Sequence, residues 1–205
     1  MRRILSSIDI GTNSIKLVVA EIFKDKINVL CAISEESRGI KNGLVDNFED
    51  VVYSIKKALK KTEDLIGLKI KKIIASIPEY NLVFTKGRGV NTINNEDNIV
   101  TKSDISRILK TCVYNKINDN YELINVIPID YKLDDKVVSN PIGMSGKKLS
   151  LNSLIVSAPK KNTYEIIKAI EKCGVEVIDI MIGSISDYAL FKNEFLSNTN
   201  GVIIN

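Results

Sequence analysis

Apolar and polar positions alternate in three runs over the first 34 residues, which predicts β-strands at residues 4–10, 15–23 and 27–34. Short polar turns separate the three runs. The following stretch, SRGIKNGLVDN, contains two glycines and predicts a connector without regular structure. Hairpin turns are expected to join these three consecutive strands.

The pattern then changes to helical spacing. Asn47 is a favourable N-cap, and an apolar stripe follows it until Gly67, where the helix is expected to end. Lysines at 56, 57, 60 and 61 fall largely outside the stripe, and no aromatic residue is interleaved with them. We therefore interpret them as a solvated helix face rather than a nucleic-acid or membrane surface. Residues 70–77 predict a short buried strand.

The middle of the chain predicts a compact unit of strand, helix, strand and strand. Residues 82–93 alternate as a strand, and Thr101 with Asp104 has the spacing of a capping box at a helix start. Residues 121–133 read as a long strand in which Pro128 indicates an edge or a bulge. The stretch 134–148 is predicted to be a loop, and residues 149–157 the last strand of the unit.

The remaining chain predicts a third helix, a strand and a fourth helix. Pro159 is expected in the first turn of the third helix, which ends at Gly174. Its predicted inner face consists of Ile166, Ile167, Ile170 and Cys173. Residues 175–182 predict a strand, Gly183 and Ser184 open the last helix, and residues 201–205 read as the start of a further strand.

The turn between the first two strands carries the candidate chemistry. If Ile10 pairs with Ile15, Asp9 lies opposite Lys16 on the same side of the hairpin. Successive amides of a Gly11-containing turn can form an anion-binding concavity, and Gly11 permits a positive φ and close approach of a ligand. Lysine meets phosphate as a point charge, and an aspartate acts on phosphate through hydrated Mg²⁺. The alternative is a surface hairpin with a polar turn.

The amino-acid composition limits the number of domains and the kinds of function that this chain can have. A chain of 205 residues can form one large domain or two small ones, and 44% hydrophobic residues are typical of a folded protein. A net charge of +4 gives no indication of nucleic-acid binding. No histidine is present, which excludes histidine-based catalysis and histidine metal sites. The three cysteines are far apart, so we expect reduced thiols.

Without residues 79–158, the predicted order is three strands, helix, strand, helix, strand and helix. This order resembles the ribonuclease-H-like subdomain of the actin/Hsp70/sugar-kinase superfamily, whose first phosphate motif D-x-G-T/S matches residues 9–12. An inserted strand–helix–strand–strand unit resembles the SHS2 subdomain of the bacterial cell-division family FtsA. The loop NPIGMSG at 140–146, and the stretches 37–47, 125–134 and 169–183, are also similar to that family.

The resemblance implies a fold class and a domain division. The fold is α/β: an actin-like subdomain 1A with an inserted SHS2 subdomain 1C. Subdomain 1A is expected at 1–78 and 159–205, and the insert at 79–158. Residues 201–205 correspond to the strand that leads into the second phosphate motif, and Asn205 takes the position of that motif's aspartate. The remaining lobe and a C-terminal membrane-binding helix of the family have no counterpart in this chain.

The resemblance also implies ligands and partners. Cofactors are ATP and Mg²⁺ at an incomplete site: Asp9 would hold Mg²⁺ through water, and the phosphates would meet Gly11, Thr12, Asn13 and Lys16. No catalytic residue and no enzyme activity are expected. Expected partners are FtsZ, other divisome proteins and further copies in a filament, and nucleic acid is not expected. The location is the cytoplasmic face of the membrane at the division septum.

Two alternatives remain open. The SHS2 unit could act as an interaction module independent of nucleotide. The chain could instead be an exopolyphosphatase-like phosphohydrolase of the same superfamily, because IDIGTNSIKL also resembles the opening of that family. The insert and the NPIGMSG loop speak against this second alternative.

Overall fold

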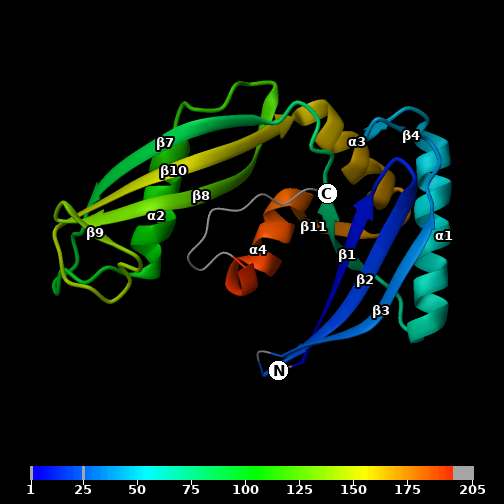
Figure 1. The fold of residues 1–205 in the computed structure, drawn as a ribbon, viewed down its shortest axis with the longest axis horizontal. Helices are drawn as coiled ribbons and strands as arrows, with labels where there is room; N and C mark the ends of the chain where they lie inside the picture. Colours follow the sequence, from blue (N-terminus) through cyan, green and yellow to red (C-terminus); the bar gives the residue numbers. More distant parts are fainter. Residues whose placement is uncertain (1, 25, 196–205) are drawn as a thin grey trace. The chain divides into compact units, whose positions relative to one another are not determined.

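The structure, a computed structural model, describes residues 2–24 and 26–195. The strand expected at 201–205 lies outside the described residues. The chain forms two compact units (Figure 1). The first runs from the N-terminus to Tyr80 and resumes at Lys161, and the second comprises Asn81–Lys160.

The first unit is built on a five-stranded sheet in the order β11-β6-β1-β2-β3. The hairpins β1–β2 and β2–β3 are antiparallel, whereas β6 runs parallel to both of its neighbours, β1 and β11. The predicted strands are confirmed, with ends that differ by at most two residues. Their bounds are β1 Arg3–Ile10, β2 Ser14–Phe23, β3 Lys26–Glu36, β6 Lys72–Ser76 and β11 Glu176–Met181.

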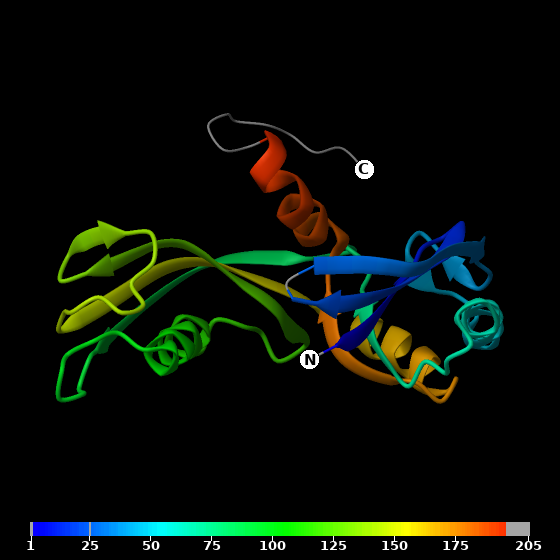
Figure 2. The same cartoon turned by 90° about the horizontal axis from the view of Figure 1, so that it is seen from below.

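Three helices belong to this unit: α1 (Phe48–Ile66), α3 (Lys160–Glu171) and α4 (Gly183–Phe195). Both α1 and α3 lie on one side of the sheet (Figures 1 and 2) and share one apolar core with it. Burying this face removes apolar surface from water, which is the main stabilising contribution. The largest fully buried side chains of this core are Ile8, Ile15, Leu17, Ile55, Ile73, Ile166 and Ile170.

The ends of α1 follow from its sequence. The side chain of Asn47 accepts hydrogen bonds from the amides of Glu49 and Asp50, and Gly67 ends the helix in the left-handed region. Both features confirm the prediction. The start of α3 does not. Pro159 is the last residue of a strand and pairs with Tyr121, so α3 begins one residue later. A proline at a strand end is tolerated because it removes no central ladder hydrogen bond.

The predicted connector before α1 is wrong, because it forms a small hairpin of β4 (Ile40–Lys41) and β5 (Leu44–Val45). Gly39 explains how the chain closes this hairpin. Its φ is +80°, and its carbonyl oxygen accepts hydrogen bonds from the amides of Asp46 (2.8 Å) and Asn47 (3.1 Å). A Cβ at this position would lie 2.3 Å from the Asn47 carbonyl oxygen, so only glycine fits.

The second unit has a four-stranded sheet in the order β7-β10-β8-β9, with α2 along one face (Figure 2). Its own apolar core includes Ile108, Cys112, Leu149 and Leu151. The bounds are β7 Val83–Thr92, α2 Lys102–Val113, β8 Tyr121–Leu133, β9 Lys136–Val138 and β10 Lys148–Pro159.

Two sequence predictions for the second unit, at Pro128 and at residues 134–148, can be compared with the structure. Pro128 adjoins a bulge, because the register of β8 against β10 passes from Asp130 to Pro128 and skips Ile129. The predicted loop 134–148 is wrong in part, since it contains β9. Asp134 and Asp135 both have positive φ and form the turn that leads from β8 into the antiparallel β9. Two successive aspartates are compatible with this turn because their short polar side chains tolerate the left-handed region.

Candidate functional site

The hairpin of β1 and β2 pairs as predicted: Ile10 lies opposite Ile15 and Asp9 opposite Lys16. The register continues across the sheet, because Asp9 also faces Ser76 of β6, and Lys16 faces Ser34 of β3. Directly opposite residues share one face of a sheet. A polar row of Ser76, Asp9, Lys16 and Ser34 therefore crosses the face opposite to that covered by α1 and α3.

Within the predicted four-residue turn, one backbone amide already has a partner. The Gly11 amide donates a hydrogen bond to the Ser14 carbonyl oxygen (3.0 Å), so this amide is engaged within the turn. The φ of Gly11 is outside the left-handed region, so the turn does not use the positive φ that glycine permits. Space explains the glycine instead, because a Cβ would lie 3.1 Å from the Ser14 carbonyl oxygen.

Residues of the segment 37–43 donate hydrogen bonds to the rest of the turn. The Gly43 amide donates to the Thr12 hydroxyl (3.0 Å), and the Ser37 amide donates to the Asn13 carbonyl oxygen (3.1 Å). Within residues 2–24 and 26–195, the backbone amides of Thr12 and Asn13 donate to no protein group. The turn thus has two backbone N–H donors available, and successive backbone N–H groups of this kind can bind an anion.

A hollow of about 460 Å³ lies on the polar face beside this row. Asp9 and Lys16 line it, together with Ser76 at the end of β6 and with Ser186 and Asp187 of α4. The sequence prediction missed these last three residues. Ser76 could have been found, since it is the last polar residue of the predicted strand 70–77 and a parallel neighbour brings it level with Asp9.

The start of α4 borders the hollow through Gly183. The Ser184 amide donates to a carboxylate oxygen of Glu79 (2.6 Å), so this helix end already has an acidic cap. A carboxylate at a helix N-terminus is favourable because the first amides carry partial positive charge. Glu79 gave no signal in the sequence, because it is separated from α4 by the whole second unit.

The site residues fit a hydrated magnesium ion. Asp9 and Lys16 are exposed neighbours, yet the ion pairs of the described residues do not include one between them. The carboxylate oxygens of Asp9 are therefore open to another cation. Across the described ranges, no group of three or more metal-ligating side chains is present. One carboxylate, water and phosphate oxygens form a ligand set that Mg²⁺ accepts.

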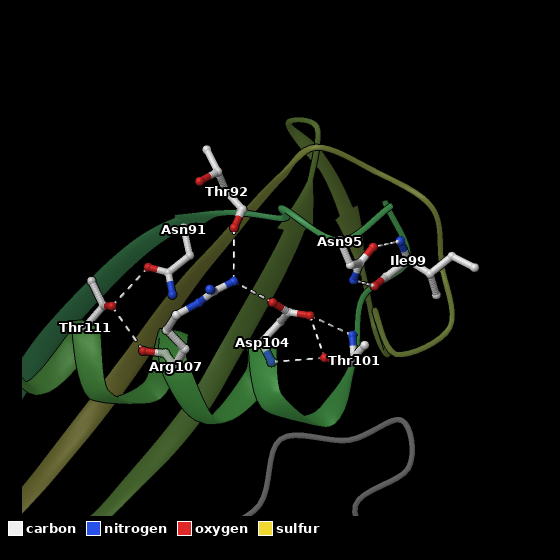
Figure 3. A network of polar contacts seen from close by, with 8 residues as sticks. All are labelled: Asn91, Thr92, Asn95, Ile99, Thr101, Asp104, Arg107 and Thr111. Atoms are coloured by element: carbon white, nitrogen blue, oxygen red, sulfur yellow. Dashed lines mark hydrogen bonds and ion pairs between the residues drawn. The ribbon is translucent and has the colours of Figure 1, made fainter. Parts of the chain in front are cut away.

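The second unit contains a polar network of a different kind (Figure 3). The Thr101 amide donates to Asp104 (2.9 Å), and the Asp104 amide donates to the Thr101 hydroxyl, which confirms the predicted capping box. Hydrogen bonds from Thr101 hold the pKa of Asp104 below its ordinary value, and Arg107 adds to the effect. Arg107 also donates to the Thr92 carbonyl oxygen (3.1 Å), which ties α2 to the end of β7.

Two loops of the second unit are joined by backbone hydrogen bonds. The Gly143 amide donates to the Val100 carbonyl oxygen, and the Val100 amide donates to the Met144 carbonyl oxygen, both at 2.9 Å. The joined loops present three half-exposed apolar side chains: Ile99, Ile142 and Met144. Apolar side chains on a fixed loop pair form a surface that a partner can bind.

Comparison with known proteins agrees with the division of the chain into two units. The family described as "SHS2 domain inserted in FTSA" matches residues 81–157. The PilM-PilN type IV pilus biogenesis complex has a chain with a similar fold: TM-score 0.59, 9% identity, 92% of this chain and 50% of that chain. Among the helices of the described residues, none is long and apolar enough to cross a membrane.

Cell division protein FtsA from three organisms is similar to most of this chain. The Streptococcus pneumoniae serotype 2 (strain D39) protein is 25% identical over 92% of this chain and 42% of its own length. The corresponding figures are 24%, 92% and 43% for Bacillus subtilis (strain 168), and 24%, 94% and 46% for Escherichia coli K12. The chain thus spans less than half the length of these relatives.

The fold and the inserted unit define the class: an actin-like ATPase fold that carries an SHS2 domain. Within this class, the chain is a homologue of the cell division protein FtsA. The extent of the matches is consistent with an N-terminal portion of that protein.

Proposed function

We propose that this chain acts in cell division as part of an FtsA-type adaptor, which tethers the FtsZ ring to the membrane and recruits divisome proteins. The observation that carries the proposal is the combination of an SHS2 domain of the FtsA type with similarity to FtsA over 92–94% of the chain. Further copies in a filament complete the set of proposed partners. The proposed location is the cytoplasmic face of the membrane at the septum.

The hairpin is the proposed nucleotide site within this adaptor. The free amides of Thr12 and Asn13 would meet phosphate oxygens, and Lys16 would neutralise phosphate charge. Gly11 would keep the turn tight enough for a close approach, and Asp9 would hold Mg²⁺ through water. The bound metal would neutralise phosphate charge. The residues that line the hollow of about 460 Å³ all belong to the first unit, so we expect weak ATP binding and negligible turnover by this chain alone.

A titration with Mg²⁺-ATP tests the site. We expect binding of this chain weaker than micromolar, and a further loss in Asp9→Ala because the water-mediated metal contact disappears. Asp130→Ala is the matched control: it removes an aspartate from the second unit and should leave ATP binding unchanged. Micromolar affinity that Asp9→Ala abolishes would refute weak binding by the isolated chain. Equal binding by the wild type and Asp9→Ala would refute the site itself.

A second candidate function is a nucleotide-independent interaction module in the SHS2 unit. The joined loops favour it, because their hydrogen bonds fix Ile99, Ile142 and Met144 at the surface. Methionine adapts its shape to different partners, which suits a protein-binding surface. The unit has its own core, so its folding does not depend on the nucleotide site.

The interaction module makes a separate prediction. A fragment of residues 79–158 should fold alone and show cooperative thermal unfolding. In the full chain, Met144→Asp should weaken capture of divisome partners, whereas Tyr114→Asp, which changes another exposed residue of the unit, should not. Partner capture that requires ATP and survives Met144→Asp would contradict this candidate. Release of phosphate from polyphosphate by the intact chain would instead favour a phosphohydrolase.

A further inference from the structure

The first unit has a second hollow, of about 520 Å³. It is lined by the second half of α1, by the segment that precedes β6 and by the segment that precedes β11. Four lysines line it: Lys56 and Lys60 from α1, and Lys69 and Lys71 from the segment before β6. Glu63 is its one acidic lining residue. The four lysines and one glutamate that line the hollow thus sum to a net charge of +3.

The lysines of α1 divide into two sets with different partners. Lys57 (2.8 Å) and Lys61 make ion pairs with the carboxylate of Glu35. Lys56 and Lys60 point to the hollow, and within the described ranges neither they nor Lys69 or Lys71 has a carboxylate within 4.0 Å. All four lysines of the run are exposed, as predicted for a solvated helix face, and Lys56 and Lys60 in addition line the hollow.

The walls of the hollow are held in place. A carboxylate oxygen of Glu63 accepts a hydrogen bond from the Ile70 amide (2.8 Å), which fixes the segment that carries Lys69 and Lys71. Cys173 donates to the Ala169 carbonyl oxygen (3.2 Å). Burial raises the pKa of this thiol, and the nearby positive charge of Lys56 opposes the rise. Glu63 is thus engaged with the backbone, and the four ammonium groups remain for a ligand.

We propose that this hollow binds the phosphate groups of an anionic ligand, at a site separate from the hairpin. Ammonium groups attract phosphate as point charges, and four of them suit a ligand with several phosphate charges. The volume is within the range of small-molecule sites. A neighbouring hollow of about 500 Å³ shares Lys69, Ile70 and Lys71 and adds the half-exposed Leu68 and Ile4. The same phosphate site could therefore take a soluble oligophosphate or a lipid headgroup.

The test uses the full chain and two probes: inorganic tripolyphosphate without Mg²⁺, and vesicles with about one-third phosphatidylglycerol in phosphatidylcholine. The variant Lys60→Gln/Lys69→Gln removes two lining charges. The control Lys110→Gln/Lys136→Gln removes two exposed charges of the second unit. A background of Asp9→Asn/Lys16→Gln disables the hairpin, so that failure of one site is distinguished from failure of the other.

We expect the Lys60/Lys69 variant to lose about tenfold to thirtyfold in affinity for at least one probe, because each lysine contributes on the order of 1 kcal/mol near an anionic surface. The control variant should bind like the wild type, the loss caused by Lys60→Gln/Lys69→Gln should be equally large in the hairpin background, and added salt should weaken binding. Lysine-dependent binding of tripolyphosphate assigns a soluble ligand, and lysine-dependent binding of vesicles alone assigns a lipid headgroup. Absence of binding to both probes, or equal loss in the control variant, would overturn the proposal.

Discussion

Replacement of Gly89 by alanine is expected to lower the free energy of unfolding of the second unit by about 1–2 kcal/mol. Gly89 lies on β7 directly beneath α2, and a Cβ there would be 2.9 Å from both the Ile108 carbonyl oxygen and the Cys112 sulfur. Overpacking of this kind costs about 1–3 kcal/mol. Alanine offsets about 0.5–1 kcal/mol of this loss of stability, because it loses less backbone conformational entropy than glycine when a strand forms. The steric cost of the added Cβ is larger than the gain in entropy, so the variant should be less stable than the wild type.

Urea unfolding measures this difference. Val90→Ala is the matched control, since Val90 is the next residue of β7 and its side chain is 45% exposed on the other face of the sheet. It should change the midpoint of unfolding much less than Gly89→Ala. A Gly89→Ala variant as stable as the wild type would show that α2 moves away from the sheet without cost, and would contradict close packing at this position.

Replacement of Glu35 by glutamine is expected to remove a pH-dependent part of the stability of the first unit. The two hydrogen-bonded lysines, Lys57 and Lys61, lower the pKa of Glu35 from 4.5 to about 2. The same contact raises the pKa of Lys57. Because the folded-state pKa of Glu35 is depressed, its contribution is complete above pH 4.5 and is lost as the pH falls from about 4.5 to about 2.

Urea midpoints of the wild type and Glu35→Gln should therefore differ most near pH 7 and converge at the acidic end of this window. The carboxylate of Glu35 is only 8% exposed, so removal of its charge leaves two lysines without their partner. Glu36→Gln is the control: its ion pair with Arg38 (3.3 Å) is exposed on both sides and adds little. A pH-independent difference for Glu35→Gln would indicate lost packing instead of lost charge.

Local signals predicted the elements of this fold because they are encoded by neighbouring residues. Asn47 and Gly67 bound α1, and Thr101 with Asp104 opens α2, since caps act within one helical turn. The turn of the β1–β2 hairpin was equally local, and the pairing of Asp9 with Lys16 followed from strand period and loop length.

Contacts between distant segments could not be predicted in this way. Glu79 caps α4 across 105 residues of sequence, and Glu35 meets lysines of α1 that lie 22 and 26 positions away. The division of the lysine run into a paired set and a free set depends on where β3 passes, which periodicity does not encode. The short strands β4 and β9 were missed because two or three residues are too few to show alternation.

The strand register of the second unit has a consequence for its history. Val83 pairs with Ser157, so the point where the chain enters this unit lies beside the point where it leaves. A module whose ends meet in this way can be gained, exchanged or lost by a gene while the host domain needs only a short joint to close the gap. Lineages can therefore change this module without redesigning the five-stranded sheet of the first unit.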